Sequence, residues 1–462
     1  MKIMKLKLEN YGRFSSLELP LATSETVNSN VTVIVGNNGA GKTTILTSLA
    51  TSLNWLVARL RREGGSTSSI SEGAIKNGTS LSSITVYFKH DELNSVQKQT
   101  SLWDSEESEF HSWKLVKGRE GKEKGEASEL TQLTKLASIY RATYTQDDNA
   151  SLPLIIYYPD DRTVADIDVD TPNKTEYTQF DAYTDGLLRG ANFNDFFEWF
   201  RYQEDLENES LMSQSALDEL KKSVEKAVYE QIVLAQESKR NPQLQAVRAA
   251  ITVFMPEYTE LHIKRKPRLH MSIKKHDEVL DVAQLSKGEK CMLALVGDIA
   301  RRMAVLNPSL ENPLEGEGIV MIDEVDAHLH PRWQQTVITN LEKTFPNVQF
   351  VVTTHSPQVL STVKKDSIEI IDNGARVPVI GDTYGVASSD ILKEVMKVNP
   401  TPRIERVLKL EAYLEMIDLG THISDEGVAL RAELEKDELF GKEHAELQKA
   451  DRKIRRKGLL SS

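Results

Sequence analysis

The order of apolar and polar side chains divides the chain into strand-like and helix-like stretches. Apolar and polar side chains alternate along residues 2–10, as in a half-buried strand. Short, nearly continuous apolar runs typical of buried strands occur at 31–35, 152–159, 319–323 and 349–353. Helical periodicity follows Lys42 to about residue 62 and returns over 287–306. This alternation of strands and helices predicts an α/β core.

Residues 190 to about 255 change to helical periodicity and predict an insertion into that core. Phe193, Phe196, Phe197 and Phe200 fall on one helical face, and we interpret them as core side chains rather than a stacking platform for bases. A second predicted helix aligns Leu217, Leu220, Val224 and Val228. From Ser388 onward the pattern is helical and highly charged. The predicted domains are an N-terminal lobe (1–190), a helical insertion (191–255), a C-terminal lobe (256–400) and a helical tail (401–462) that contacts a partner or another copy.

Composition narrows the class of protein. The 462 residues are 39% hydrophobic and 27% charged, an ordinary globular balance. No apolar stretch approaches the ~18 residues that span a bilayer. Cys291 is the only cysteine, so an internal disulfide is excluded, and we expect a cytoplasmic protein without a membrane partner. The net charge of −12 does not attract nucleic acid overall, but the basic runs 262–276 and 449–457 are candidate contacts for nucleic acid or a partner.

The run GNNGAGKT (36–43) fits the phosphate-loop pattern G-x-x-x-x-G-K-[ST] at every fixed position. Its glycines let the backbone curl so that its N–H groups surround phosphates, and a helix begins where the loop ends. Lys42 supplies a positive charge to the β and γ phosphates, and the Thr43 hydroxyl can ligate Mg²⁺. The cofactors are therefore ATP and Mg²⁺. The predicted nucleotide-binding residues are Gly36, Asn37, Asn38, Gly39, Ala40, Gly41, Lys42, Thr43 and Thr44.

The run GIVMIDE (318–324) is a buried strand that ends in two acids. With a phosphate loop upstream, Asp323 is the second predicted Mg²⁺ ligand beside Thr43. Glu324 is placed to polarise an attacking water as a general base. The catalytic hypothesis is therefore hydrolysis of ATP with Glu324 as the base.

Two further motifs resemble those of ABC ATPases. LSKGEK (285–290) resembles the signature L-S-G-G-Q: Ser286 and Gly288 match, whereas Lys287 and Glu289 depart from it. A serine hydroxyl and a glycine amide at a helix N-terminus form a second phosphate-binding surface. The resemblance implies that Ser286, Gly288 and Glu289 contact the nucleotide of another subunit, in an ATP-sandwich homodimer or a higher oligomer.

VVTTHSP (351–357) ends an apolar strand at His355, which resembles the switch histidine of ABC ATPases. The resemblance implies that His355 contacts the γ-phosphate and acts with Glu324. His328 and His330 lie where the loop after the second carboxylate crosses the dimer interface in ABC heads, and no third ligand at zinc-site spacing accompanies them. No glutamine follows Pro159, where ABC heads carry one, and YYPDDR (157–162) takes its place.

Together these motifs identify an ABC-type P-loop NTPase head of the SMC/RecF-like branch. Residues 180–200, 310–334 and 345–361 resemble PtuA, the ATPase subunit of Septu-type anti-phage systems; related ATPases accompany some retrons. The resemblance covers about residues 1–400. It implies a separate HNH nuclease partner (PtuB-like) and nucleic-acid cleavage during phage infection. DNA or RNA, or a retron reverse transcriptase with its msDNA, are further candidate partners.

Three other functions remain as alternatives. A RecF- or SMC-like DNA-repair ATPase usually carries long coiled-coil arms, and an insertion of about sixty residues is short for them. The ATPase subunit of a transporter needs a membrane partner. A nuclease with an ABC head fused to a Toprim domain needs a D-x-D pair, which is absent after His355. The expected fold is an α/β ABC-type head with a helical insertion and a helical C-terminal tail, without a nuclease site of its own.

Overall fold

The computed structural model describes residues 1–23, 25–27, 29–93, 110–121, 126–161, 177–187, 193–212, 214–237, 239–436 and 444–460. The chain separates into two compact units, Met1–Ile391 and Leu392–Ser462. The first unit contains every predicted nucleotide-binding and catalytic residue. The predicted boundary between residues 190 and 191 lies outside the described residues, and the division of the head into lobes stays a prediction.

A six-stranded sheet forms the centre of the first unit, in the order β13-β12-β3-β11-β10-β6. The strands from β12 to β6 are parallel, and β13 pairs antiparallel at the edge. Every residue of β3, β6, β10 and β11 is buried, as their apolar runs predict. The strands are β3 (Val31–Val35), β6 (Leu154–Tyr158), β10 (Gly318–Ile322), β11 (Val348–Thr353), β12 (Ile368–Asp372) and β13 (Ala375–Val377).

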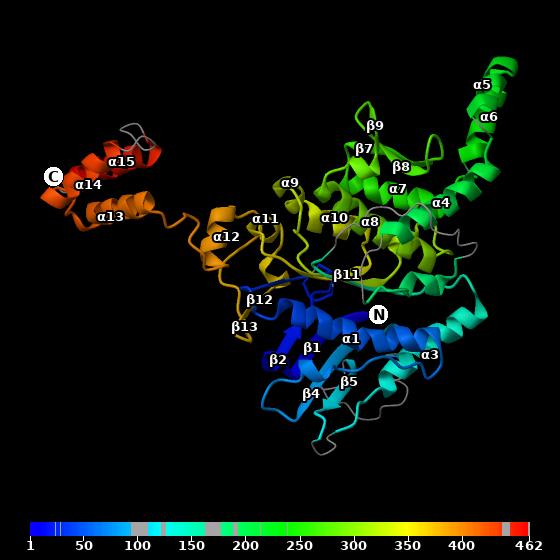
Figure 1. The fold of residues 1–462 in the computed structure, drawn as a ribbon, viewed down its shortest axis with the longest axis horizontal. Helices are drawn as coiled ribbons and strands as arrows, with labels where there is room; N and C mark the ends of the chain where they lie inside the picture. Colours follow the sequence, from blue (N-terminus) through cyan, green and yellow to red (C-terminus); the bar gives the residue numbers. More distant parts are fainter. Residues whose placement is uncertain are drawn as a thin grey trace. The chain divides into compact units, whose positions relative to one another are not determined.

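A four-stranded antiparallel sheet, β2-β1-β4-β5, forms a second layer. Helix α1 (Lys42–Arg61) contacts β4 of this sheet and β6, β10 and β11 of the central sheet, so it packs between the layers. Its apolar positions, among them Ile45, Leu49 and Leu53, are fully buried. Figure 1 shows α1 on one side of the central sheet and α8 and α10 on the other. The outer layer contains β1 (Lys2–Tyr11), β2 (Phe14–Pro20), β4 (Leu81–Lys89), β5 (His111–Gly118) and α3 (Thr131–Gln146).

In the described part of the chain, four helices occupy the region predicted as a helical insertion, which lies in the sequence between strands β6 and β10 of the central sheet. Phe193, Phe196, Phe197 and Phe200 are buried, which confirms them as core side chains. The second predicted helix is instead two helices, α5 and α6, with a break at residues 224–225, and Val228 is 43% exposed. The helices are α4 (Phe193–Ser210), α5 (Gln214–Ser223), α6 (Lys226–Glu237) and α7 (Pro242–Phe254).

A three-stranded antiparallel sheet follows the insertion and carries the first basic run. It contains β7 (Tyr258–Lys264), β8 (His270–Lys275) and β9 (Glu278–Asp281). The following helix, α8 (Lys287–Leu306), contacts α4, α7 and β6. Further helices of the first unit are α9 (Pro331–Gln334), α10 (Val337–Thr344) and α11 (Pro357–Leu360), and α12 (Ser388–Glu394) spans the boundary between the two units. Short 3-10 helices are η1 (Glu72–Ala74), η3 (Gln179–Tyr183), η4 (Val282–Gln284), η5 (Pro313–Glu315) and η6 (Lys365–Ser367).

The second unit is helical and has a small core of its own. Leu410, Tyr413 and Ile417 pack with Leu434 and Leu447 inside it. Its helices are α13 (Glu405–Leu419), α14 (Asp425–Lys436) and α15 (Ala445–Leu460). The expected α/β fold with a helical C-terminal part is thus confirmed. Among the described residues, no helix is both long enough and apolar enough to cross a membrane.

Candidate active site

Three neighbouring parallel strands bring the predicted motifs to one edge of the central sheet. Strand β11 lies between β3 and β10 and is parallel to both. The carboxyl ends of parallel strands meet at one edge, where ligands of open α/β sheets bind. The phosphate loop follows β3, Asp323 and Glu324 follow β10, and His355 is the second residue after β11. The three motifs therefore converge although the first and the last of them are more than 300 residues apart in the sequence.

The phosphate loop forms a tight turn into α1. Gly41 precedes the helix with φ of 102°, a left-handed conformation that favours glycine. A β-carbon at Gly41 would lie 2.5 Å from Cζ of Phe14, so no larger residue fits without rearrangement. The Ala40 amide donates to the Asn37 carbonyl at 2.9 Å and closes the loop. The loop thus places backbone N–H groups around a space at the start of a helix, which is an anion-binding arrangement.

Lys42 lies across this loop and is buried. Its Nζ donates to the carbonyls of Gly36 at 2.9 Å and Asn37 at 3.3 Å. Burial lowers the pKa of Lys42, and the nearby carboxylates of Asp323 and Glu324 act against that shift. The lysine is therefore held beside the acidic residues by weak carbonyl acceptors. A phosphate is a stronger acceptor for the same ammonium group.

Asp323 offers one unused carboxylate oxygen. The residue is 1% exposed, and its Oδ1 accepts a hydrogen bond from the Thr353 hydroxyl. Its Oδ2 is buried and has no hydrogen-bond partner among the described residues. A buried, unpaired carboxylate oxygen costs free energy unless a cation or donor reaches it. The donor chemistry therefore fits Mg²⁺, with the exposed Thr43 at the start of α1 as the second predicted protein ligand.

Thr353 also holds Glu324, and the sequence analysis missed it. The Glu324 amide donates to the Thr353 hydroxyl at 2.7 Å, and Glu324 itself has a left-handed φ of 48°. The next threonine, Thr354, donates to Oδ1 of Asp326 at 2.5 Å. The signal was a threonine pair that closes an otherwise apolar strand. These hydroxyls fix the backbone that carries both acids, and His355, which is half-buried, follows directly.

The signature turn caps helix α8 with its own side chains. The Ser286 hydroxyl accepts from the Glu289 amide at 3.4 Å, and Oε2 of Glu289 accepts from the Ser286 amide at 2.7 Å, which is a capping box. Glu289 also bonds to the Tyr258 hydroxyl and accepts from Lys275 Nζ at 3.0 Å. Partial burial would raise the pKa of Glu289, but these hydrogen bonds outweigh it and lower the pKa to about 2.

The side chain of Glu289 is therefore bound within its own subunit, to strands β7 and β8. Its predicted contact with the nucleotide of another subunit stays a prediction. Ser286 is exposed. A β-carbon at Gly288 would lie 2.4 Å from the His328 carbonyl, so the signature turn packs tightly on the loop after Glu324. Within the described residues, no hydrogen bond joins this turn to the phosphate loop.

Other polar residues near the site have structural contacts. His330 caps α9, because its Nδ1 accepts from the Arg332 amide at 3.2 Å. The part of the chain that the structure describes contains no group of three or more His, Cys, Asp or Glu side chains suited to a metal. Arg13 was not predicted, but a β-carbon at Gly39 would lie 3.9 Å from its Nη1. The exposed Arg13 guanidinium therefore lies beside the phosphate loop as a further candidate contact.

Comparison with known proteins assigns the family. The family model described as AAA domain matches residues 5–261. A protein of Vibrio cholerae serotype O1 biovar El Tor named retron Vc95 probable ATPase is 34% identical, over 91% of this chain and 84% of its own. The retron Ec83 probable ATPase of Escherichia coli is 30% identical, over 94% and 83%. The Septu protein PtuA of Bacillus mycoides (strain KBAB4) is 47% identical over 16% of this chain and 10% of its own.

The chain belongs to the family of the retron ATPases. The expected resemblance to defence ATPases is thereby confirmed. A solved SMC head bound to the C-winged helix domain of ScpA has a TM-score of 0.41 and 15% identity, covering 86% of this chain and 100% of that one. A likeness this distant supports no inference about activity or partners. In this retron-type ATPase, the individual roles of Lys42, Asp323, Glu324 and Ser286 stay predictions.

Proposed function

We propose that the chain is the ATP-binding and ATP-hydrolysing subunit of a defence complex and that its nucleotide state controls a separate HNH nuclease. The proposed ATP binding and hydrolysis are supported by the arrangement of side chains at the carboxyl edge of the central sheet. Among the described residues, a buried lysine bonds only to carbonyls and lies near a carboxylate that has an unpaired oxygen. A phosphate with its Mg²⁺ satisfies both groups at once.

Each residue at this edge has a distinct proposed role. Lys42 and the backbone N–H groups of residues 36–44 hold the phosphates. Asp323 and Thr43 hold Mg²⁺, which supplies positive charge to the phosphate oxygens. Glu324 takes the proton of the attacking water, and His355 contacts the γ-phosphate. The Thr353 hydroxyl orients Asp323 and the Glu324 backbone, so the base is fixed before the nucleotide arrives.

We propose that a second copy completes the site through Ser286. This serine is exposed at the N-terminus of the 20-residue helix α8, where the helix dipole favours an anion. In mixed dimers of a Lys42→Ala chain and a Ser286→Arg chain, one site is doubly damaged and the other is intact. Recovery of ATPase activity on mixing supports the shared site. No recovery in dimers shown to be mixed contradicts it.

The nuclease partner is proposed from the family alone. The decisive experiment expresses the chain with and without the HNH protein encoded beside it and measures cleavage of DNA and RNA. We expect no cleavage by the lone chain, cleavage by the pair, and a changed level when Glu324→Gln prevents hydrolysis. Metal-dependent cleavage by the lone chain would refute the division of labour. A reverse transcriptase gene as neighbour identifies a retron, which the long matches to two retron ATPases favour.

We propose the second unit as the contact for that partner. Leu414 and Ile417, two apolar positions of α13, pack into the unit's own core. The most exposed large apolar side chains in the described part of this unit are Leu419, Ile423 and Val428, at 72%, 78% and 58%. Deleting residues 402–462 should abolish capture of the nuclease while leaving ATP binding intact. Retained capture by the folded deletion variant would refute this contact.

A further inference from the structure

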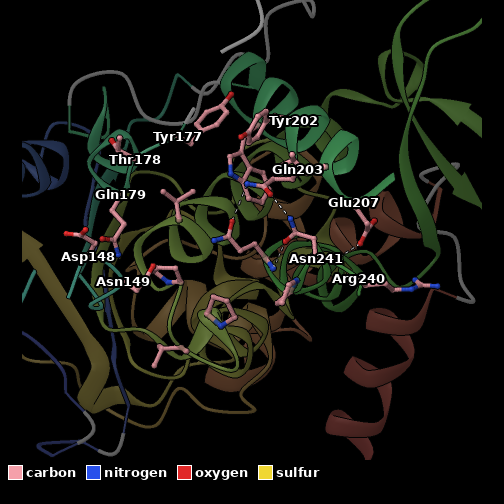
Figure 2. A pocket seen from close by; sticks show the side chains of 18 of the residues that line it. Asp148, Asn149, Tyr177, Thr178, Gln179, Tyr202, Gln203, Glu207, Arg240 and Asn241 are labelled. Atoms are coloured by element: carbon pink, nitrogen blue, oxygen red, sulfur yellow. Dashed lines mark hydrogen bonds between the residues drawn. The ribbon is translucent and has the colours of Figure 1, made fainter. Parts of the chain in front are cut away.

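A cavity of about 780 Å³ with a mixed polar and apolar lining lies where helices α4 and α7 of the insertion meet the head (Figure 2). None of its lining residues belongs to the phosphate loop, the acidic strand end or the signature turn. Its volume is within the ~300–1,000 Å³ typical of ligand sites. The lining contains aromatic rings, carboxamides and two cations, and few aliphatic side chains. The residues that line the cavity therefore differ from the aliphatic side chains that surround a gap in a hydrophobic core.

Tyrosine rings form one side of the cavity. Tyr177 and Tyr202 lie with ring centroids 5.4 Å apart and an interplanar angle of 51°. Figure 2 shows the two rings next to each other at the pocket. Tyr144, which also lines the cavity, contacts Phe180 edge-on at 5.1 Å. All three lining tyrosines are half-buried, so ring surface is available to a planar ligand. Stacking of a base on such a ring is a general mode of nucleotide recognition.

Carboxamides form the floor between α4 and α7. Asn241 Nδ2 donates to Gln203 Oε1 at 2.6 Å, and Gln203 Nε2 donates to Gln243 Oε1 at 3.3 Å. Each carboxamide has two donor hydrogens and two acceptor lone pairs, so this chain of three leaves groups for a ligand. A group with adjacent donors and acceptors matches the edge of a nucleobase. The contacts within the chain hold the side chains in place before binding.

Positive charge lies at the start of α7. Lys239 and Arg240 line the cavity and are exposed, and no ion pair within the described part of the chain uses either one. They precede the 13-residue helix α7, whose first amides are capped by Asn241 Oδ1, so the positive charge at this end comes from the two side chains. Of the two lining carboxylates, Glu207 is paired with Arg248 at 3.0 Å, which leaves Asp148. The α7 end of the cavity is therefore suited to an anion.

We infer that this cavity binds a nucleotide unit, with the base against Tyr177 and Tyr202 and a phosphate near Lys239 and Arg240. A sugar without a phosphate would make no charged contact with Lys239 or Arg240, and a simple anion would make no stacking contact with the tyrosine rings. The unit can come from a free nucleotide or from the phosphorylated end of a single strand, since both present a base and a phosphate. This site is additional to the ATP site and does not depend on the proposed control of a nuclease.

The test uses the full chain with Lys42→Ala, which silences the phosphate loop. Equilibrium dialysis measures binding of labelled AMP and, separately, of a labelled short single-stranded DNA with a 5′ phosphate. Tyr202→Ala removes a ring, and the double change Lys239→Glu with Arg240→Glu reverses the charge. Matched controls are Tyr384→Ala, at a tyrosine 64% exposed outside the cavity, and Lys226→Glu, at a lysine with a 91% exposed side chain on α6.

We expect saturable binding that weakens about tenfold or more in either pocket variant, because each removes a stacking or charge-assisted contact. Binding in the controls should be unchanged. Pocket-dependent binding of AMP identifies a free nucleotide as ligand, and pocket-dependent binding of the strand alone identifies a strand end. Tyr177→Ala, on a segment outside α4, repeats the ring test if Tyr202→Ala misfolds. Absence of saturable binding of both probes, or binding that the folded pocket variants leave unchanged, overturns the inference.

Discussion

Replacing Thr353 with valine tests the central hydrogen-bond arrangement of the candidate active site. The side chain is fully buried, and valine has nearly the same shape, so the change removes a hydroxyl and leaves the packing. That hydroxyl donates to Oδ1 of Asp323 and accepts from the Glu324 amide. Because Oδ2 of Asp323 already has no partner in the described chain, the variant leaves a buried carboxylate without any hydrogen bond at either oxygen.

The expected cost follows from the two groups that lose their partner. A buried polar group left unsatisfied costs about 1–3 kcal/mol, so the loss at two groups should lower the free energy of unfolding of Thr353→Val by about 2–6 kcal/mol. Thr353→Ser is the matched control, since it keeps the hydroxyl and loses one methyl, worth about 0.8 kcal/mol. Urea unfolding of both variants, without nucleotide, measures the difference.

ATP turnover gives an independent measurement on the same pair. A positioned general base contributes about 10²–10⁴-fold, and the variant frees the backbone that positions Glu324. We expect Thr353→Val to lose at least about tenfold of that turnover and Thr353→Ser to lose little. Equal stability and equal turnover for valine and serine would refute the role of the hydroxyl, because the two side chains differ at this site chiefly in that group.

The remaining predictions concern four charged residues. Lys42→Ala should weaken equilibrium ATP binding at least about tenfold, since charge-assisted hydrogen bonds are worth about 1.5–3 kcal/mol each; unchanged affinity contradicts the site. Glu324→Gln should keep ATP binding and lose about 10²–10⁴-fold in turnover; wild-type turnover excludes it as a rate-determining base. Asp298→Ala should cost about 3–5 kcal/mol in urea unfolding, because it leaves the fully buried guanidinium of Arg302 without its carboxylate. The lowered pKa of Glu289, about 2, means that its stabilising contribution is complete above pH ~4.5 and is lost as pH falls toward 2. Glu289→Gln should therefore flatten the acid dependence of stability in that window, and an unchanged slope counts against the contact with Lys275.

Local sequence patterns were sufficient for four of the six strands of the central sheet, β3, β6, β10 and β11, whereas β12 and β13 were not predicted. Buried parallel strands are continuous apolar runs, and the phosphate loop has fixed glycines because its backbone must turn tightly. Both signals lie within a few neighbouring residues. The strand that ends at Ile322 was therefore predicted to within a residue, and the phosphate loop lies where the pattern puts it. The break between α5 and α6 was missed, because both sides of it have the same helical periodicity.

Contacts between distant segments explain what the sequence could not predict. Glu289 was read as a departure from the signature, whereas its partners Tyr258 and Lys275 lie 31 and 14 residues away on two strands whose register is set only by pairing. The cavity is a stronger case, because Tyr177 and Tyr202 lie on either side of the insertion boundary and meet only when α4 packs on the head. The periodicity of a single segment cannot predict a contact between two segments such as the one between Tyr177 and Tyr202. The phosphate loop was predictable because all of its residues are neighbours in the sequence. The tyrosine-lined cavity required the structure, because its residues come from segments that meet only in the fold.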